Sequence, residues 1–197
     1  MEWHTTSTIL ESLRDQSNDA AWRQFDARFR SAILGFARRM GIPDTDAEDV
    51  AQDTLVEFAS AYRKGRFDRE KGRLSRWLFG IAYRQALNGR RTRQRQTAKA
   101  GVGQAETSFW ANVPDKASAS ASWDSQWEQA LLQQCLDQVA REVETTTLRA
   151  FQLVVGQNHS PATAAEQLGV PIKTVYNAKH RVLNRIRELR SALENVA

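Results

Sequence analysis

Apolar residues recur with a helical period along most of this chain. Between residues 18 and 40, six large apolar side chains follow one another at spacings of three or four: Trp22, Phe25, Phe29, Ile33, Phe36 and Met40. This spacing places them on one face of a helix with about 3.6 residues per turn. Similar patterns predict helices over about 46–64, 74–90, from 127 onward, 160–168 and 172–194, and no segment has a strand pattern. The sequence therefore predicts an all-α fold.

The composition changes in the middle of the chain. Residues 96–126 are rich in Thr, Gln, Ser, Ala and Gly, and they show little apolar periodicity. The 197 residues suffice for two small domains. We therefore predict two small helical domains, residues 1–95 and 127–197, joined by a flexible linker over 96–126. Aromatic residues are unusual in a spacer and suggest that parts of this segment dock on a surface: Phe109, Trp110 and Trp123.

Several classes of protein are disfavoured by the composition. A single cysteine, Cys135, cannot form an internal disulfide, and no apolar run approaches the roughly 20 residues of a membrane span. The first residues are neither basic nor apolar, as a signal peptide would require. We therefore expect a cytoplasmic protein without a membrane partner. The sequence has no phosphate-binding glycine loop, nucleophile elbow or metal-ligand cluster, so we expect no enzyme activity, metal or cofactor.

Charge is segregated along the chain, although the net charge is only +5. Residues 44–57 contain six acids and no Lys or Arg, whereas residues 84–99 contain six bases and no acid. Residues 173–190 contain six bases and one acid, Glu188. Any one of these segments alone is more typical of a solvated helix face than of a binding site. Two basic segments in separate domains favour bivalent binding to a long polyanion, and the acidic segment favours a basic protein partner.

The segment from residue 160 to residue 186 has the pattern of a helix-turn-helix. Ser160 can cap a helix that Pro161 begins, and Gly169 can adopt the left-handed conformation of the turn. The second helix is predicted to bury Ile172, Val175, Val182 and Ile186. Its other face would carry donors for phosphates and base edges. A helical hairpin in an ordinary bundle is the alternative, but it does not require that bias towards donors.

Two stretches together resemble one family. The segment DAEDVAQDTL at 46–55, followed by FDREKGRLSRWLFGIA at 67–82, is similar to region 2 of bacterial RNA polymerase sigma factors. The later helix-turn-helix is similar to region 4. A short chain with only these two regions resembles the extracytoplasmic-function (ECF, group IV) class. The resemblance covers about residues 18–95 and 127–190. It implies a sigma factor that recruits core polymerase to promoters for transcription initiation, with an anti-sigma factor as a further class of partner.

The resemblance also implies three sets of site residues. The surface that binds the clamp helices of the largest polymerase subunit would comprise Asp46, Glu48, Asp49, Gln52 and Asp53, with apolar contact through Leu55 or Val56. The −10 element, read as a single strand with a flipped base, would meet Phe67, Arg73, Trp77, Tyr83, Arg84, Asn88 and Arg91. The −35 element, read as duplex DNA, would meet Lys173, Thr174, Tyr176, Asn177, His180 and Arg181.

Two other functions compete with this interpretation. A stand-alone helix-turn-helix transcription regulator would explain the C-terminal domain but would leave the acidic segment without a role. A protein-binding adaptor would leave both basic segments without a role. Charge reversal at Asp49 and Asp53 separates these hypotheses, because only a sigma factor would lose polymerase binding while retaining its affinity for duplex DNA.

Overall fold

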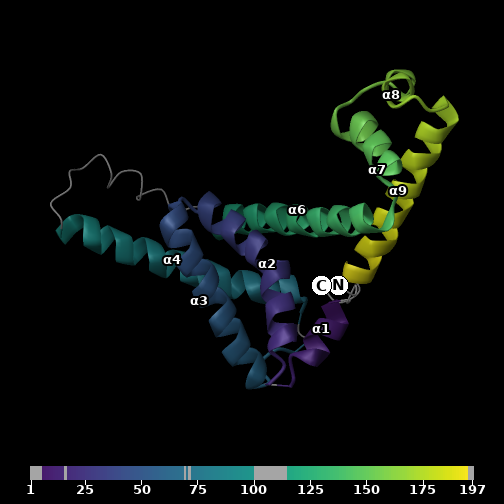
Figure 1. The fold of residues 1–197 in the computed structure, drawn as a ribbon. Helices are drawn as coiled ribbons and strands as arrows, with labels where there is room; N and C mark the ends of the chain where they lie inside the picture. The colour runs from purple at the N-terminus through teal and green to yellow at the C-terminus, as the bar shows by residue number, and fades with distance from the viewer. Residues whose placement is uncertain (1–5, 16, 69, 71, 100–114, 195–197) are drawn as a thin grey trace. The chain divides into compact units, whose positions relative to one another are not determined.

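The computed structural model describes residues 6–15, 17–68, 70, 72–99 and 115–194. These residues form helices and their connections, and none of them lies in a strand (Figure 1). The chain divides into two compact units, with the division between Ala130 and Leu131. We call residues 7–130 the N-terminal unit and the residues from 131 onward the C-terminal unit. The predicted all-α fold with two small domains is therefore confirmed.

The N-terminal unit contains α1 (Thr6–Ser12), α2 (Asp19–Arg39), α3 (Asp44–Arg63), α4 (Leu74–Lys99) and the first part of α6 (Lys116–Glu142). Helix α2 begins at a cap, because Asn18 Oδ1 accepts a hydrogen bond of 3.0 Å from the backbone N–H of Ala21. Helix α4 extends beyond the predicted end at residue 90. Helix α1 has no counterpart among the predicted elements.

The core of the N-terminal unit is built from the predicted aromatic face of α2. Phe25, Phe29 and Phe36 are each at most 1% exposed. Phe25 stacks on Phe58 of α3 with ring centroids 4.3 Å apart, and Phe36 meets Phe79 of α4 edge to face at 5.9 Å. Aromatic pairs at these separations add to the free energy gained by burying the rings. The aromatic face of α2 thus packs against α3 and α4, the helices that carry the predicted polymerase-binding residues and most of the predicted −10 residues.

Helix α6 begins inside the predicted linker. Residues 116–126 are helical and not a flexible spacer, so this part of the prediction is wrong. Trp123 is 1% exposed, and its Nε1–H donates to Ser75 Oγ at 3.0 Å. Trp127 stacks on Phe29 at 5.0 Å. Alanine favours the helix, and burial of two indoles offsets the entropy lost on ordering the segment.

The expected docking of aromatic residues from this segment is confirmed for Trp123, while Phe109 and Trp110 lie outside the described residues. Gly35 of α2 faces the Gln126 side chain of α6. A Cβ atom there would lie 1.9 Å from Gln126 Oε1, so that side chain would have to move. Residues 116–130 are therefore packed as part of the N-terminal unit.

The C-terminal unit consists of the remainder of α6, α7 (Thr145–Phe151), the π-helix η2 (Gln152–Gly156), α8 (Pro161–Leu168) and α9 (Ile172–Glu194). The predicted helix-turn-helix signals are confirmed. Ser160 Oγ accepts from the N–H of Thr163 at 3.1 Å, and Gly169 has a φ of 63°. One cluster joins these helices: Ala150, Leu153, Ala164, Ala165, Val175 and Ala178.

The predicted buried face of α9 needs one correction. Val175, Val182 and Ile186 are buried, but Ile172 is 45% exposed. Ile172 is the first residue of α9, where the chain has just left the turn after Gly169. The buried set is completed instead by Ala178, Leu189 and Leu193. On the opposite side, Lys173, Thr174, Tyr176, Asn177, His180 and Arg181 are exposed.

An ion pair joins α6 to α9 within the C-terminal unit. Arg185 donates to both carboxylate oxygens of Glu142, at 2.6 and 3.0 Å, and Gln138 donates to the same group at 2.7 Å. The hydrogen bond from Arg185 is the main reason why the pKa of Glu142 lies below its ordinary value of 4.5. The charged form of Glu142 is therefore favoured in the folded state.

We expect the Glu142→Gln variant to lose less stability in acid than the wild-type protein. A lowered folded-state pKa gives a contribution that is fully present above about pH 4.5 and is lost as the pH falls through the lower, folded value. At pH 7 the variant should be less stable by up to about 1 kcal/mol, because the pair is partly exposed. Thermal unfolding between pH 3 and 7 tests this. The matched variant Glu166→Gln should keep the wild-type profile, and identical acid sensitivity in all three proteins would contradict the prediction.

Candidate binding surfaces

The six acids of α3 fall into two groups, those that form ion pairs with arginines that the structure describes and those that do not. Four of them pair with arginines of neighbouring helices: Asp44 with Arg38, Asp46 with Arg93, Glu48 with Arg30, and Glu57 with Arg84. Asp49 and Asp53 are exposed and form no ion pair or hydrogen bond with any residue that the structure describes. Most of the acidic charge is therefore used to hold α3 against α2 and α4, and two carboxylates are left for another molecule.

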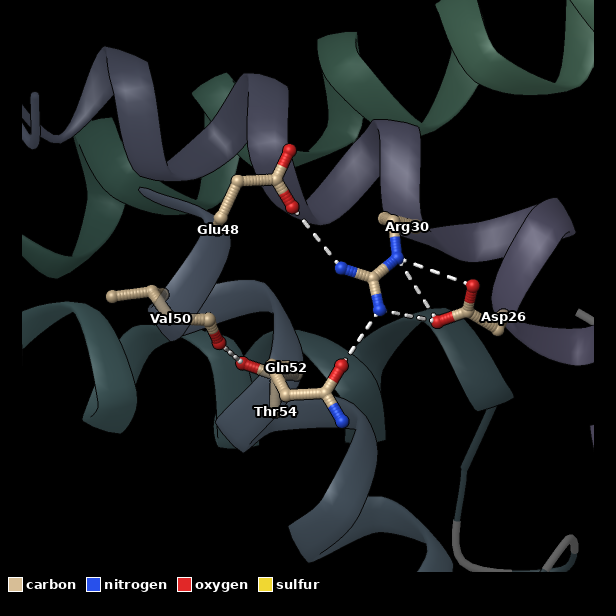
Figure 2. A network of polar contacts seen from close by, with 6 residues as sticks. All are labelled: Asp26, Arg30, Glu48, Val50, Gln52 and Thr54. Atoms are coloured by element: carbon tan, nitrogen blue, oxygen red, sulfur yellow. Dashed lines mark hydrogen bonds and ion pairs between the residues drawn. The ribbon is translucent and has the colours of Figure 1, made fainter. Parts of the chain in front are cut away.

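The pairing is densest around Arg30 of α2 (Figure 2). Its Nη1 donates to Glu48 at 3.1 Å, its Nη2 donates to Gln52 Oε1 at 2.8 Å, and it also binds Asp26 of its own helix at 2.7 Å. The hydrogen bond to Asp26 is the main cause that raises the pKa of Arg30. Arg30 therefore fixes Glu48 and Gln52, two of the predicted polymerase-binding residues, against α2.

The two available carboxylates lie on one face of α3. Asp49, Asp53 and Val56 follow at spacings of four and three, so their side chains share one stripe of the helix. Val56 is 56% exposed, whereas Leu55 is 8% exposed. Of the two apolar candidates, Val56 is therefore the one that a partner can reach. We call Asp49, Asp53 and Val56 the α3 stripe.

Helix α4 brings together most of the residues predicted to bind the −10 element. At about 100° per residue, Trp77, Arg84, Asn88 and Arg91 lie within roughly 60° around the helix axis. Arg84, Asn88 and Arg91 are exposed, and so is Arg73, which precedes the helix. We call Arg84, Asn88 and Arg91 the α4 face.

Three of the predicted −10 residues are packed against other rings: Phe67, Trp77 and Tyr83. Tyr83 lies about 100° from Arg84 around the helix, and its ring is 5.6 Å from that of Phe79. The structure therefore does not bring Tyr83 to the α4 face. Trp77 is half-buried and contacts Phe58 of α3 at 5.1 Å.

Phe67 covers part of Trp77. The two rings stack with their centroids 5.0 Å apart and their planes 28° from parallel. Phe67 is itself half-buried and also lies 6.1 Å from the ring of Tyr62. Phe67 is thus anchored to the aromatic core of the N-terminal unit.

Not every base of the segment 84–99 is free to bind DNA. Arg90 is 6% exposed, and its Nη1 donates to the carbonyl of Met40 at 2.5 Å, at the end of α2. Burial lowers the pKa of this guanidinium. Arg93 pairs with Asp46. Arg90 and Arg93 therefore hold α4 in place, whereas the residues of the α4 face are exposed, although Arg84 also pairs with Glu57.

Helix α9 exposes all six residues predicted to read the −35 element. Lys173, Thr174, Tyr176, Asn177, His180 and Arg181 are exposed, and Val175, Ala178 and Val182 are buried on the other side. The acid Glu188 pairs with Arg185. Within the described part of the chain, Lys173 and Arg181 have no acidic partner. The first three turns of α9 therefore present cations and amide or hydroxyl donors.

Sequence reasoning missed the roles of Arg30, Glu57 and Arg93. Only one contact of this group had a visible signal, since Asp26 and Arg30 are four residues apart on one helix. The other pairs join different helices, and their spacing in the sequence, 27 residues for Glu57 and Arg84, carries no pattern. Only the packing of the three helices reveals them.

In the ranges that the structure describes, no group of three or more His, Cys, Asp or Glu side chains is placed to hold a metal ion. None of the described helices has the length and apolar character that crossing a bilayer requires.

Comparison with known proteins agrees with the sequence resemblance. Residues 25–96 match the family model for sigma-70 region 2. The ECF RNA polymerase sigma factor RpoE of Cereibacter sphaeroides is 26% identical over 184 residues, which cover 91% of this chain and 92% of that protein. The RNA polymerase sigma factor CnrH of Cupriavidus metallidurans is 37% identical over 89 residues, which cover 44% of this chain and 45% of CnrH.

A solved structure, "Structure of CnrH in complex with the cytosolic domain of CnrY", aligns with 93% of this chain and 96% of its own at 22% identity and a TM-score of 0.36. The family assignment follows from the sequence matches alone. Residues 25–96 form a sigma-70 region 2 domain. These matches support a sigma factor role in transcription initiation, and the chain resembles the sigma factors of the ECF class.

Proposed function

We propose that this sigma factor binds core RNA polymerase through α3, contacts the −10 element as a single strand along α4, and reads the −35 element as duplex DNA with α9. The observation that carries the proposal is the α3 stripe. Four acids of α3 form ion pairs with arginines of α2 and α4, whereas Asp49 and Asp53 are exposed beside the apolar Val56.

The α3 stripe suits a basic helical partner, for which the clamp helices of the largest polymerase subunit are our proposal. An exposed ion pair contributes less than about 1 kcal/mol, so two carboxylates alone cannot supply the affinity. Apolar burial of Val56 and neighbouring surface must add to it, at roughly 25 cal/mol per Å². Asp46, Glu48 and Gln52 support the stripe from the side, because arginines of α2 and α4 hold them.

The α4 face suits a melted DNA strand. Arg84 and Arg91 can bind phosphates or stack on bases, and Asn88 can hydrogen-bond a base edge. Extraction of a base from the stack costs a few kcal/mol, which a pocket beside Phe67 and Trp77 would have to offset. Sigma binding would then favour melting by its affinity for the displaced strand. The chain would need no catalytic residue of its own, because the polymerase carries the chemistry.

The α9 face suits the major groove of a duplex. The helix follows a tight helix-helix turn, and recognition helices of this type use their N-terminal residues for base contacts. Asn177 and Arg181 are four residues apart, so both can enter one groove. Lys173 can bind a phosphate and fix the register.

The test is reconstitution with bacterial core RNA polymerase. The purified chain and core enzyme are mixed and separated by size-exclusion chromatography, and the co-eluting complex transcribes a genomic fragment library. We expect co-elution and new discrete transcripts that share −35 and −10 elements. Sequence-specific duplex binding by the chain alone, without co-elution, would instead support a stand-alone regulator and overturn the proposal.

A further inference from the structure

One carboxylate of α3 binds two neighbouring residues of α4. Oε1 of Glu57 accepts a hydrogen bond from Arg84 Nη2, and Oε2 accepts a bond of 2.8 Å from Gln85 Nε2. Arg84 belongs to the α4 face, whereas Glu57 follows directly after Val56 of the α3 stripe. Glu57 therefore lies at the border between the proposed polymerase-binding surface and the proposed DNA-binding surface.

The contact orients Arg84 while leaving it accessible. The Arg84 side chain is 61% exposed and that of Glu57 is 36% exposed. A guanidinium has five N–H donors in a rigid planar fork, so a carboxylate that holds one nitrogen also sets the plane of the rest. The other four donors, on Nη1, Nε and the second N–H of Nη2, form no hydrogen bond with any residue that the structure describes.

The charge of Glu57 also affects what Arg84 can bind. A guanidinium without a neighbouring carboxylate pairs readily with phosphates, and phosphate contacts carry no sequence information. A carboxylate beside Arg84 already occupies part of the fork and repels a phosphate. The remaining donors then favour uncharged acceptors, such as the edge of a base.

We propose that Glu57 is a positioning residue that directs Arg84 towards bases and away from phosphates, and so sets the sequence selectivity of −10 recognition. The inference rests on the proposed function, because it takes the α4 face to be the strand-binding surface. It adds a residue outside the sets that the sequence analysis assigned. It also predicts that this residue lowers total affinity for DNA while it raises selectivity.

The experiment uses the complex of this chain with core polymerase and fluorescent single-stranded oligonucleotides. One oligonucleotide carries the −10 element mapped by transcription, and the others carry one substituted base each. For Glu57→Gln we expect binding to every oligonucleotide to tighten, by about two-fold for the mapped −10 element, the effect of one exposed charge, and by more for the substituted sequences. The ratio of Kd values between substituted and preferred sequences should fall at least about three-fold, since a base contact gives roughly ten-fold discrimination or more. The slope of log Kd against log salt should rise by about 0.7.

Two further variants separate the effect of the position of the Glu57 carboxylate from the effect of its charge, and both effects from a general disturbance of the fold. Glu57→Asp keeps the charge but withdraws the carboxylate by one methylene, so selectivity should fall without the rise in affinity. Asp44→Asn removes another paired carboxylate of α3, one that binds Arg38 of α2, and should change neither quantity. Circular dichroism of each variant verifies that the helices are intact.

Arg84→Gln distinguishes failure of this inference from failure of the proposed function. If Arg84→Gln binds every oligonucleotide as the wild type does, the α4 face is not the strand-binding surface and the proposed function fails at that site. If Arg84→Gln loses affinity and selectivity while Glu57→Gln changes neither the selectivity ratio nor the salt slope, the inference about Glu57 is overturned and the proposed function stands. With the inference correct, Glu57→Gln in the Arg84→Gln background should have no further effect on selectivity.

Discussion

Replacement of both Asp49 and Asp53 by lysine is expected to weaken binding to core RNA polymerase by at least about 100-fold. Each substitution converts an attraction to a basic partner into a repulsion, and like charges placed together across an interface cost several kcal/mol. The folded chain should tolerate the change, because both side chains are exposed and form no ion pair or hydrogen bond with another described residue. Titration of labelled core polymerase with the variant measures the loss.

The matched control is Glu11→Lys with Asp124→Lys, which changes the net charge equally at exposed acids of α1 and α6. It should bind polymerase nearly as the wild type does. Duplex DNA binding by the isolated Asp49→Lys/Asp53→Lys chain should also be nearly unchanged, since the substitutions lie in the N-terminal unit and the proposed duplex contacts in the C-terminal unit. Full retention of polymerase affinity would show that the α3 stripe is only a solvated face.

The six acids of α3 show how far charge patterning in a sequence can predict a site. The segregation of acids into residues 44–57 was visible, but their division into paired and available groups was not. That division depends on which arginines of α2 and α4 come within reach after packing. Arg90 illustrates the same limit from the basic side. It stands in a run of exposed bases, yet it is buried against the end of α2.

The helix-turn-helix was predictable in detail because its signals are local. Ser160, Pro161 and Gly169 act through their own backbone geometry, and the structure places each one as the sequence predicts. The start of α6 was not predictable in this way. The alanine and serine run at 117–122 has no apolar periodicity, and it is helical because Trp123 and Trp127 reach a core made by distant residues.

Replacement of Asn177 and Arg181 by alanine is expected to remove recognition of the −35 duplex. A good contact to a base edge contributes roughly 1–3 kcal/mol of discrimination, so the double variant should lose about 30-fold to 10,000-fold in specific affinity. Both side chains are exposed on α9, opposite the buried Val175 and Val182, so the loss would not arise from unfolding. Fluorescence anisotropy with promoter duplexes of mapped and scrambled −35 sequence measures the difference.

Two variants on the same face of α9 test whether this loss is base recognition or simple charge. Asn184→Ala removes the same type of side chain seven residues further along, about 10 Å from Asn177 along the axis, where a recognition helix has left the base edges. It should keep the specific affinity. Lys173→Ala should weaken mapped and scrambled duplexes alike and reduce the salt slope by about 1, as loss of a phosphate contact does. If Asn177→Ala/Arg181→Ala also weakened both duplexes equally, α9 would contact only the phosphate backbone of the DNA. The sequence of the −35 element would then have to be read by another part of the protein.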